Sequence, residues 1–200
     1  MAELTALRRS PRRHLHDRFQ VERVASRRAV ALREVPFLGM VGVRVEPGSA
    51  AFDRLGERLG AGLPEACGRV TSAGRHSALW LGPDEWLVVS ETDGAVLAAE
   101  LRDALAGNPG SVVDVSANRT TLELSGPAAR ETLEKGCPVD LHPRSFRPGT
   151  AVATTLGLVP VLLWQTDETT YRVLPRSSFA DYVARWLLDA MTEFVGPRVP

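Results

Sequence analysis

The chain has 200 residues, of which 44% are hydrophobic and 24% are charged. This length and composition are typical of one or two small soluble domains with a buried core, and they exclude a largely disordered protein. The 24 basic and 24 acidic side chains balance, which excludes a protein that is basic or acidic throughout.

The charge is distributed unevenly along the chain. Residues 1–33 contain nine arginines but only three acidic residues, so the remainder carries an excess of acids. We expect residues 1–28 to form a flexible, arginine-rich N-terminal tail that docks on an acidic partner surface. Contact with nucleic acid is the alternative, although only Phe19 interleaves an aromatic ring with the arginines. His14 and His16 are interpreted as exposed polar residues because no third metal ligand follows nearby.

The first half of the remaining chain predicts strands at residues 30–32 and 41–45. A helix follows from Phe52 to Leu59, with Ser49 as its N-cap and Gly60 at its end. Two strands at residues 77–81 and 86–89 are joined by a turn that contains Asp84. A second helix, capped by Asp93, extends to residue 105.

The second half predicts strands at residues 112–115 and 120–124, a short helix that ends at residue 136, and strands at residues 150–155, 159–164 and 170–174. The last helix has apolar residues at helical spacing and a capping pair formed by Ser178 and Asp181. Its predicted buried face consists of Phe179, Tyr182, Val183, Trp186, Leu187 and Ala190.

Strand pairs that are separated by single helices predict one α+β domain over residues 29–195. We expect mostly antiparallel sheet with packed helices.

The sequence contains no nucleophile motif of the Gly-x-Ser-x-Gly type and no glycine-rich phosphate loop. Cys67 and Cys137 have neither disulfide nor zinc spacing. We therefore assign no catalytic, cofactor-binding or metal-binding residue. The absence of an apolar leader or of a run of about 18 apolar residues favours the cytoplasm and argues against a membrane protein.

Five short motifs, in this order, are similar to the gamma subunit of heterotetrameric sarcosine oxidase. The resemblance extends from about residue 30 to residue 190, and it rests on the ordered series rather than on any one motif. The motifs are Leu-Gly-Pro-Asp-Glu-Trp-Leu at 81–87, Asp-Val-Ser-Ala-Asn-Arg at 114–119, Leu-Ser-Gly-Pro-Ala-Ala-Arg at 124–130, Lys-Gly-Cys-Pro-Val-Asp-Leu at 135–141 and Arg-Ser-Ser-Phe-Ala-Asp-Tyr at 176–182.

That family resembles the folate-binding fold of the glycine-cleavage T-protein, an aminomethyltransferase. The T-proteins hold the pterin ring with a glutamate in a Gly-Phe-Glu-Leu motif. Here Thr-Tyr-Arg-Val at 170–173 matches this motif, so Arg172 replaces the carboxylate. A guanidinium only donates hydrogen bonds. The resemblance therefore implies that the fold is kept and the folate site is lost.

By resemblance, the chain is a non-catalytic gamma subunit that assembles with alpha, beta and delta subunits. The complex would oxidise sarcosine to glycine, transfer the one-carbon unit to tetrahydrofolate and produce hydrogen peroxide. FAD, FMN, NAD, zinc and tetrahydrofolate would bind to the other subunits. A free-standing folate-dependent aminomethyltransferase and a nucleic-acid-binding module are the alternatives.

We expect two polar segments to lie at the subunit interface. The first contains Asp84 and Trp86, and the second contains Asp114, Asn118 and Arg119. Trp and Arg are frequent interface anchors. An internal ion pair of Arg119 with Asp114 or Asp84 is the alternative.

Overall fold

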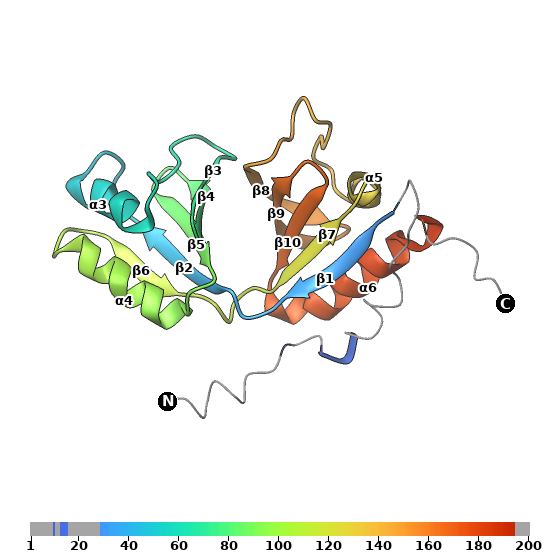
Figure 1. Ribbon diagram of the computed structural model, residues 1–200, viewed down its shortest axis with the longest axis horizontal. Coiled ribbons are helices and arrows are strands. Elements are labelled where there is room, and N and C mark those ends of the chain that lie inside the picture. The colour runs from blue at the N-terminus through green and yellow to red at the C-terminus, as the bar shows by residue number, and fades with distance from the viewer. Residues whose placement is uncertain (1–9, 11–12, 16–28, 195–200) are drawn as a thin grey trace.

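The computed structural model describes residues 10, 13–15 and 29–194. Its ten strands form two five-stranded antiparallel sheets, with α-helices along the outer face of each (Figure 1). The predicted α+β class with mostly antiparallel sheet is confirmed.

The first sheet has the strand order β3-β4-β5-β2-β6. Its strands are β2 (Gly39–Arg44), β3 (Val70–Ala73), β4 (His76–Gly82), β5 (Glu85–Ser90) and β6 (Ser111–Asp114). Helices α3 (Ala50–Leu59) and α4 (Gly94–Leu105) accompany it. The predicted caps are confirmed, because Ser49 and Asp93 accept backbone hydrogen bonds and Gly60 ends α3 in the left-handed conformation.

The second sheet has the order β8-β9-β10-β7-β1. Its strands are β1 (Ala31–Val35), β7 (Thr121–Ser125), β8 (Thr150–Leu156), β9 (Val159–Asp167) and β10 (Thr170–Pro175). Helices α5 (Ala129–Glu134) and α6 (Ala180–Ala190) accompany it. Short 3₁₀ turns lie at Arg13–Leu15 (η1), Ser177–Phe179 (η2) and Thr192–Phe194 (η3).

The two sheets are an internal structural repeat. The run β2-α3-β3-β4-β5-α4 is followed along the chain by β7-α5-β8-β9-β10-α6, and the strand orders of the two sheets correspond. Each run is completed by an edge strand from outside it, β6 beside β2 and β1 beside β7. We call the β2–β6 unit the first half, and β1 with residues 121–194 the second half.

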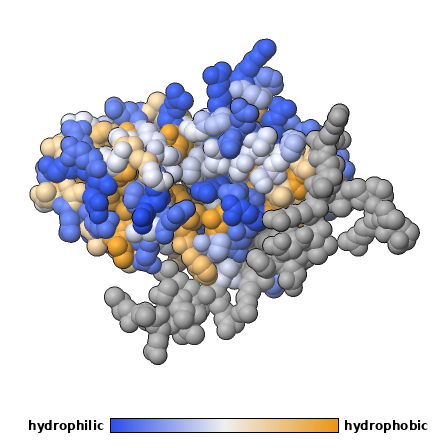
Figure 2. All heavy atoms as spheres, in the orientation of Figure 1, coloured by the Kyte–Doolittle hydropathy of each residue, from blue (hydrophilic) through white to orange (hydrophobic). Residues whose placement is uncertain are grey.

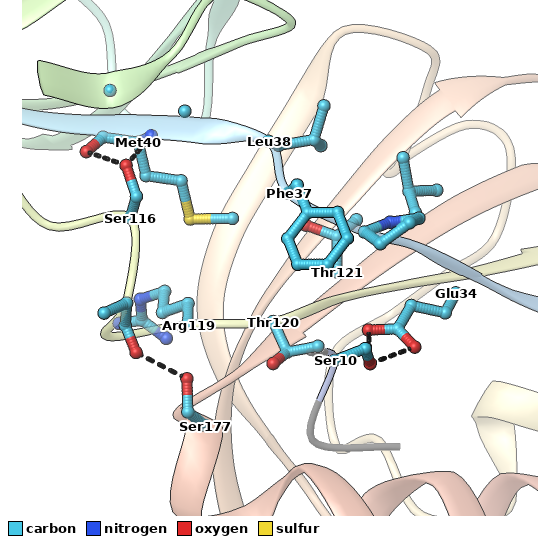
Figure 3. A pocket seen from close by; sticks show the side chains of 15 residues that line it. Ser10, Glu34, Phe37, Leu38, Met40, Ser116, Arg119, Thr120, Thr121 and Ser177 are labelled. Carbon is cyan, nitrogen blue, oxygen red and sulfur yellow. Dashed lines mark hydrogen bonds between the residues drawn. The ribbon is translucent and has the colours of Figure 1, made fainter. Parts of the chain in front are cut away.

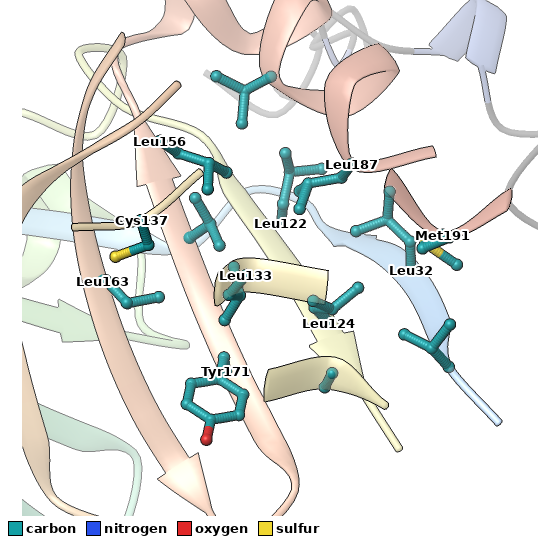
Figure 4. Close-up of a cluster of buried hydrophobic side chains, with 14 of the residues drawn as sticks. Leu32, Leu122, Leu124, Leu133, Cys137, Leu156, Leu163, Tyr171, Leu187 and Met191 are labelled. Carbon is teal, nitrogen blue, oxygen red and sulfur yellow. The ribbon is translucent and has the colours of Figure 1, made fainter. Parts of the chain in front are cut away.

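Three buried clusters hold these layers together. One lies between the first sheet and its helices, and a second lies between the second sheet and its helices. Figure 4 shows Leu187 of α6 and Met191, which follows α6, in the second cluster. The third cluster joins the two sheets and contains Met40, Leu87 and Trp164 among its members. The halves therefore share part of their buried core.

Two expectations for the last helix are wrong. The N-cap of α6 is Phe179, which makes no side-chain cap bond, and Asp181 pairs with Arg185 and His14 at 2.7 Å in each case. Phe179 and Tyr182 are also exposed, at 44% and 50%. The buried stripe instead includes Val183 and the other apolar residues Ala184, Leu187 and Leu188.

A short part of the predicted tail packs on the second half. Leu15 is buried in the cluster beneath α6, and His14 contacts Asp181. These residues therefore differ from the solvated tail expected for them. Apart from Ser10 and Arg13, the other residues between 1 and 28 lie outside the described residues, as does residue 195 at the predicted domain end.

Candidate functional site at the junction of the two halves

Two chain crossovers connect the halves and meet at one place. Residues 36–38 lead from β1 to β2, and residues 115–120 lead from β6 to β7. Both crossovers line a pocket of about 360 Å³, together with Gly94 at the start of α4 and Ser177 in η2 (Figure 3). The predicted interface segment 114–119 thus lies at the junction of the two halves.

The crossover between β6 and β7 is bound to the first half through Ser116. The Met40 amide donates to the Ser116 hydroxyl at 3.0 Å, and that hydroxyl contacts Asp114 Oδ1 at 2.5 Å. Asp114 Oδ1 also accepts from the Ser116 amide at 2.9 Å. The Asp114 side chain is therefore used in closing the turn, although the residue is exposed.

The same crossover is bound to the second half through Asn118. Its amide oxygen accepts from Arg176 Nη1 at 3.0 Å, and its backbone carbonyl accepts from the Ser177 amide at 2.9 Å. The Ser177 hydroxyl donates to the Ala117 carbonyl at 2.7 Å. This set of bonds fixes residues 117–118 against the start of η2.

Arg119 is an internal strut in the isolated chain. Its Nη1 donates to the Leu174 carbonyl at 2.8 Å. Burial, with Arg176 nearby, lowers the pKa of its guanidinium. Within the described residues Arg119 forms no ion pair with Asp114 or Asp84, so the expected internal partners are wrong and a backbone carbonyl takes their place.

The structure does not bring the turn at Asp84 to this junction. Asp84 is exposed beside Arg44, at one end of β2, whereas Asp114 pairs with Val41 near the other end. Trp86 has no exposed surface, because its ring contacts Phe52 and its Nε1 donates to the Pro64 carbonyl at 2.7 Å. Trp86 is therefore a core residue of the chain, which corrects its expected role as an exposed anchor.

Phe37 is a feature of the junction that the sequence did not indicate. Its φ of 61° lies in the left-handed region, which costs a residue with a Cβ about 1–2 kcal/mol. Its ring is nevertheless 54% exposed and stands at the pocket (Figure 3). Neither local propensity nor burial explains an aromatic residue here, and strained residues of this kind concentrate at functional sites.

The pocket also contains a buried hydroxyl without a partner. Thr121 is 2% exposed, and its Oγ1 makes no hydrogen bond within the described residues. Around the pocket, Glu34 and the described Ser10 add polar groups, and Leu38 and Met40 add apolar ones. In the space-filling view, apolar surface is visible low in the middle of the molecule, between the two halves (Figure 2).

Arg172 occupies a second cleft, which lies between the sheets and has a volume of about 370 Å³. Its Nε donates to Glu123 at 3.3 Å, and its guanidinium lies 5.1 Å from the centre of the Trp164 ring. The other oxygen of Glu123 pairs with Arg33 at 2.5 Å. Glu123 is 8% exposed, so one buried carboxylate serves two guanidinium groups.

This arrangement does not fit a pterin ring. The pterin N–H groups need a hydrogen-bond acceptor, and the side chain in the matching position offers donors only. The adjacent carboxylate of Glu123 is already bonded to Arg33 and Arg172.

The described part of the chain has no group of three or more His, Cys, Asp and Glu side chains that could hold a metal ion. Cys67 is exposed and Cys137 is buried, and both are free thiols. Nor does any helix within these residues have the length and apolar character needed to cross a membrane.

Comparison with known proteins gives consistent matches. Residues 44–193 match the family described as sarcosine oxidase, gamma subunit. Sarcosine oxidase subunit gamma from Arthrobacter sp is 52% identical over 200 residues, which cover 100% of this chain and 97% of the relative. The same subunit from Corynebacterium sp. (strain P-1) is 49% identical, with the same coverage.

Two solved structures are also similar. Heterotetrameric sarcosine oxidase from Corynebacterium sp. U-96, in complex with pyrrole 2-carboxylate, contains a chain with a TM-score of 0.90 and 47% identity. The match covers 97% of this chain and 100% of that one. Glycine cleavage system aminomethyltransferase T from Bartonella henselae has a TM-score of 0.59 and 15% identity, over 87% of this chain and 48% of that one. The second match shows the fold alone.

Proposed function

Because the chain belongs to the sarcosine oxidase gamma subunit family, we propose that it is a non-catalytic subunit of a heterotetrameric sarcosine oxidase. Its partners are the alpha, beta and delta subunits. The complex demethylates sarcosine to glycine by oxidation, passes the one-carbon unit to tetrahydrofolate and reduces oxygen to hydrogen peroxide. FAD, FMN, NAD, zinc and tetrahydrofolate belong to the partner subunits, and the complex is cytoplasmic.

The match to a whole chain of a heterotetrameric enzyme supports the assembly, because it covers 97% of this chain at a TM-score of 0.90. One observation carries the non-catalytic part of the proposal. By the sequence resemblance, Arg172 replaces the pterin carboxylate of the T-proteins, and its guanidinium lies over Trp164 and pairs with Glu123. The chain thus uses this position for an internal contact.

The junction pocket is the proposed contact with another subunit. Phe37 is exposed and conformationally strained, and Asp114, Asn118 and Arg119 hold the neighbouring crossover in a fixed shape. An exposed aromatic side chain next to a pocket provides interface area at a low cost in conformational entropy, because it has few rotatable bonds. Asp84 remains a proposed contact at a separate place on the surface.

Tetrahydrofolate binding tests the non-catalytic part of this proposal. Calorimetric titration of the isolated chain is expected to give no saturable heat, whereas the assembled complex is expected to bind. Saturable micromolar binding by the lone chain would contradict the assignment of the folate site to a partner.

The substitution Phe37→Asn tests the junction. Asn adopts the left-handed region more readily than Phe, so the lone chain should be as stable as the wild type or slightly more so. Its affinity for the partner subunits should fall by at least about tenfold if Phe37 is an interface anchor. Unchanged affinity in a titration against the purified partner subunits would remove Phe37 from the interface. The exposed Asp84→Asn variant, tested in parallel, reports on the other surface.

A further inference from the structure

Helix α6 and its N-cap have apolar residues that are exposed in addition to those buried in the core. Val183 and Leu187 are buried, whereas Phe179 and Tyr182 are 44% and 50% exposed. Trp186 continues the exposed stripe at helical spacing and is partly buried. The helix therefore has two apolar faces, of which one faces the core and the other faces outward.

The hairpin between β8 and β9 extends this outward face. The Gly157 amide donates to the Gly136 carbonyl at 2.9 Å, which holds the hairpin against the end of α5. A Cβ on Gly157 would lie 3.5 Å from the Trp186 ring nitrogen and 3.9 Å from the Tyr182 hydroxyl. The next residue, Leu158, is 92% exposed. We call Leu158, Phe179, Tyr182 and Trp186 together the α6 aromatic face.

The corresponding helix of the first half shows that the fold does not require these residues. When the first residues of α4 and α6 are aligned, buried Leu97 corresponds to buried Val183, and buried Leu101 corresponds to buried Leu187. Both helices therefore present the same register to their sheets.

The outward positions differ in chemistry at the same register. The N-cap is Asp93 in α4 and Phe179 in α6. The seventh helical residue is Glu100 in α4, where it pairs with Arg58 at 2.7 Å, and Trp186 in α6. The third residue is Val96 in α4, which is 52% exposed, and Tyr182 in α6. At these three positions the described residues place aromatic rings on α6 and none on α4.

We infer that the α6 aromatic face is a docking surface for an apolar patch on another subunit of the enzyme complex. Aromatic residues are enriched at protein interfaces because they bury a large area with few rotatable bonds. The nearby Asp181 pairs with both Arg185 and His14 at 2.7 Å, so the surface offers its rings rather than an unmatched carboxylate.

A subunit of different sequence is the occupant that the observations favour. This inference rests on the proposed function, because the matching solved chain belongs to a heteromeric enzyme and corresponds to this chain along its whole length. The face lies on the end of η2, on α6 and on the β8–β9 hairpin, and none of its four residues lines the junction pocket, although Ser177 of η2 does. The two surfaces can therefore be tested by separate substitutions.

The experiment uses the full chain with Leu158→Ser, Phe179→Ser and Tyr182→Ser combined. It is co-expressed and titrated with the other subunits of the complex, beside the wild type. The affinity of the variant for the partners is expected to fall at least about tenfold. Its melting temperature as a lone chain is expected to stay near that of the wild type, because the replaced side chains are exposed. Leu158→Ser alone, at the hairpin tip, provides a second variant with little risk to folding.

The matched control is Val96→Ser, which removes an exposed apolar side chain from the same register of α4 and should leave assembly unchanged. If the wild type assembles and the triple variant assembles equally well, the inference is wrong while the proposed function stands. If the wild type does not assemble with the other subunits, the proposed function is wrong, and the docking of the α6 aromatic face on one of them is wrong as well. Loss of wild-type self-association in the variant would assign the face to a second copy and overturn the inference. A lower melting temperature with unchanged affinity per folded chain would assign the α6 aromatic face to a contact within the chain, and it would also overturn the inference.

Discussion

One row of residues across each sheet shows how the two halves diverge. In the first sheet the row runs through paired residues of five strands, Val113, Gly42, Leu87, Leu79 and Val70. The corresponding row of the second sheet is Arg33, Glu123, Arg172, Trp164 and Ala151. The same backbone frame therefore carries an apolar row in one half and an ion cluster in the other.

The two halves keep buried apolar residues in two places. One is the side of each sheet that packs on its helices, and the other is the middle of the contact between the two sheets. Leu79 and Leu87 meet Trp164 in the shared cluster, and buried leucines occupy matching positions under α4 and α6. The residues at the other end of the row, and those on the outer faces of the helices, differ between the halves. These are the places where the second half has acquired its charges and its aromatic rings.

The largest effect is expected at the matching core positions Leu101 and Leu187, both fully buried. Replacing either by Ala should lower the free energy of unfolding by about 2–5 kcal/mol, because each leaves a cavity. The shared cluster between the sheets predicts a single transition for both variants. Urea unfolding followed by circular dichroism and by Trp fluorescence measures this. Two transitions that differ between the probes would show that the halves unfold separately.

A smaller effect is expected in the charged row. Glu123→Gln leaves the guanidinium groups of Arg33 and Arg172 without their carboxylate, and the Arg172 side chain is only 23% exposed. We expect a loss of about 1–3 kcal/mol in the free energy of unfolding. Urea titration of the variant and the wild type measures this difference.

The control for this prediction copies the first half. A triple variant with Arg33→Val, Glu123→Ala and Arg172→Leu replaces the cluster by apolar residues and should recover most of the loss, because buried ion pairs and apolar substitutes are often similar in stability. A triple variant less stable than Glu123→Gln would mean that the second half depends on its charges in a way that the first half does not.

The sequence predicted the elements of both halves better than it predicted their relation. Ser49, Gly60 and Asp93 carry local signals, since a cap acts within one turn of its own helix, and all three were confirmed. The internal repeat was missed because the two halves share the order of their strands in the sheets, which the sequence does not display, and not a repeated series of residues. Edge strand β1 comes before the first half in the chain yet completes the second sheet.

Site residues were harder to predict because their partners are distant in sequence. Arg172 was identified through the family resemblance, but its pairing with Glu123 joins residues 49 positions apart. Trp86 and Tyr182 were assigned to the wrong environments. Trp86 was expected at an interface because Trp is a frequent anchor, yet Trp is also a common core residue. Tyr182 was expected in the core because periodicity cannot say which of two apolar faces of a helix meets it. Phe37 gave no signal of its own, because Phe rarely adopts a positive φ. The preceding Pro36 is a turn residue, but it does not indicate that an exposed aromatic ring follows it.

The smallest expected effect is a difference in the pH response of the two halves. In the first half, burial and then the charge of Arg75 lower the pKa of His76 below its usual 6.5. The stability that neutral His76 contributes is present above pH 6.5 and is lost as the pH falls toward its folded pKa. In the second half, burial raises the pKa of Tyr171 above 10.0. Its contribution is present below pH 10 and is lost as the pH rises through the folded pKa.

Melting temperatures from pH 5 to pH 11 test this difference with one variant in each half. His76→Gln retains a polar group beside Ser90, whose hydroxyl lies 2.9 Å from His76 Nδ1, and should flatten only the acid side of the profile. Tyr171→Phe keeps the ring stacked near Phe146 and should flatten only the alkaline side. The two effects should add in the double variant, because the groups lie in different sheets. If either substitution changed both sides of the profile, titration in one half would be coupled to packing in the other, and the halves would not be independent in this respect.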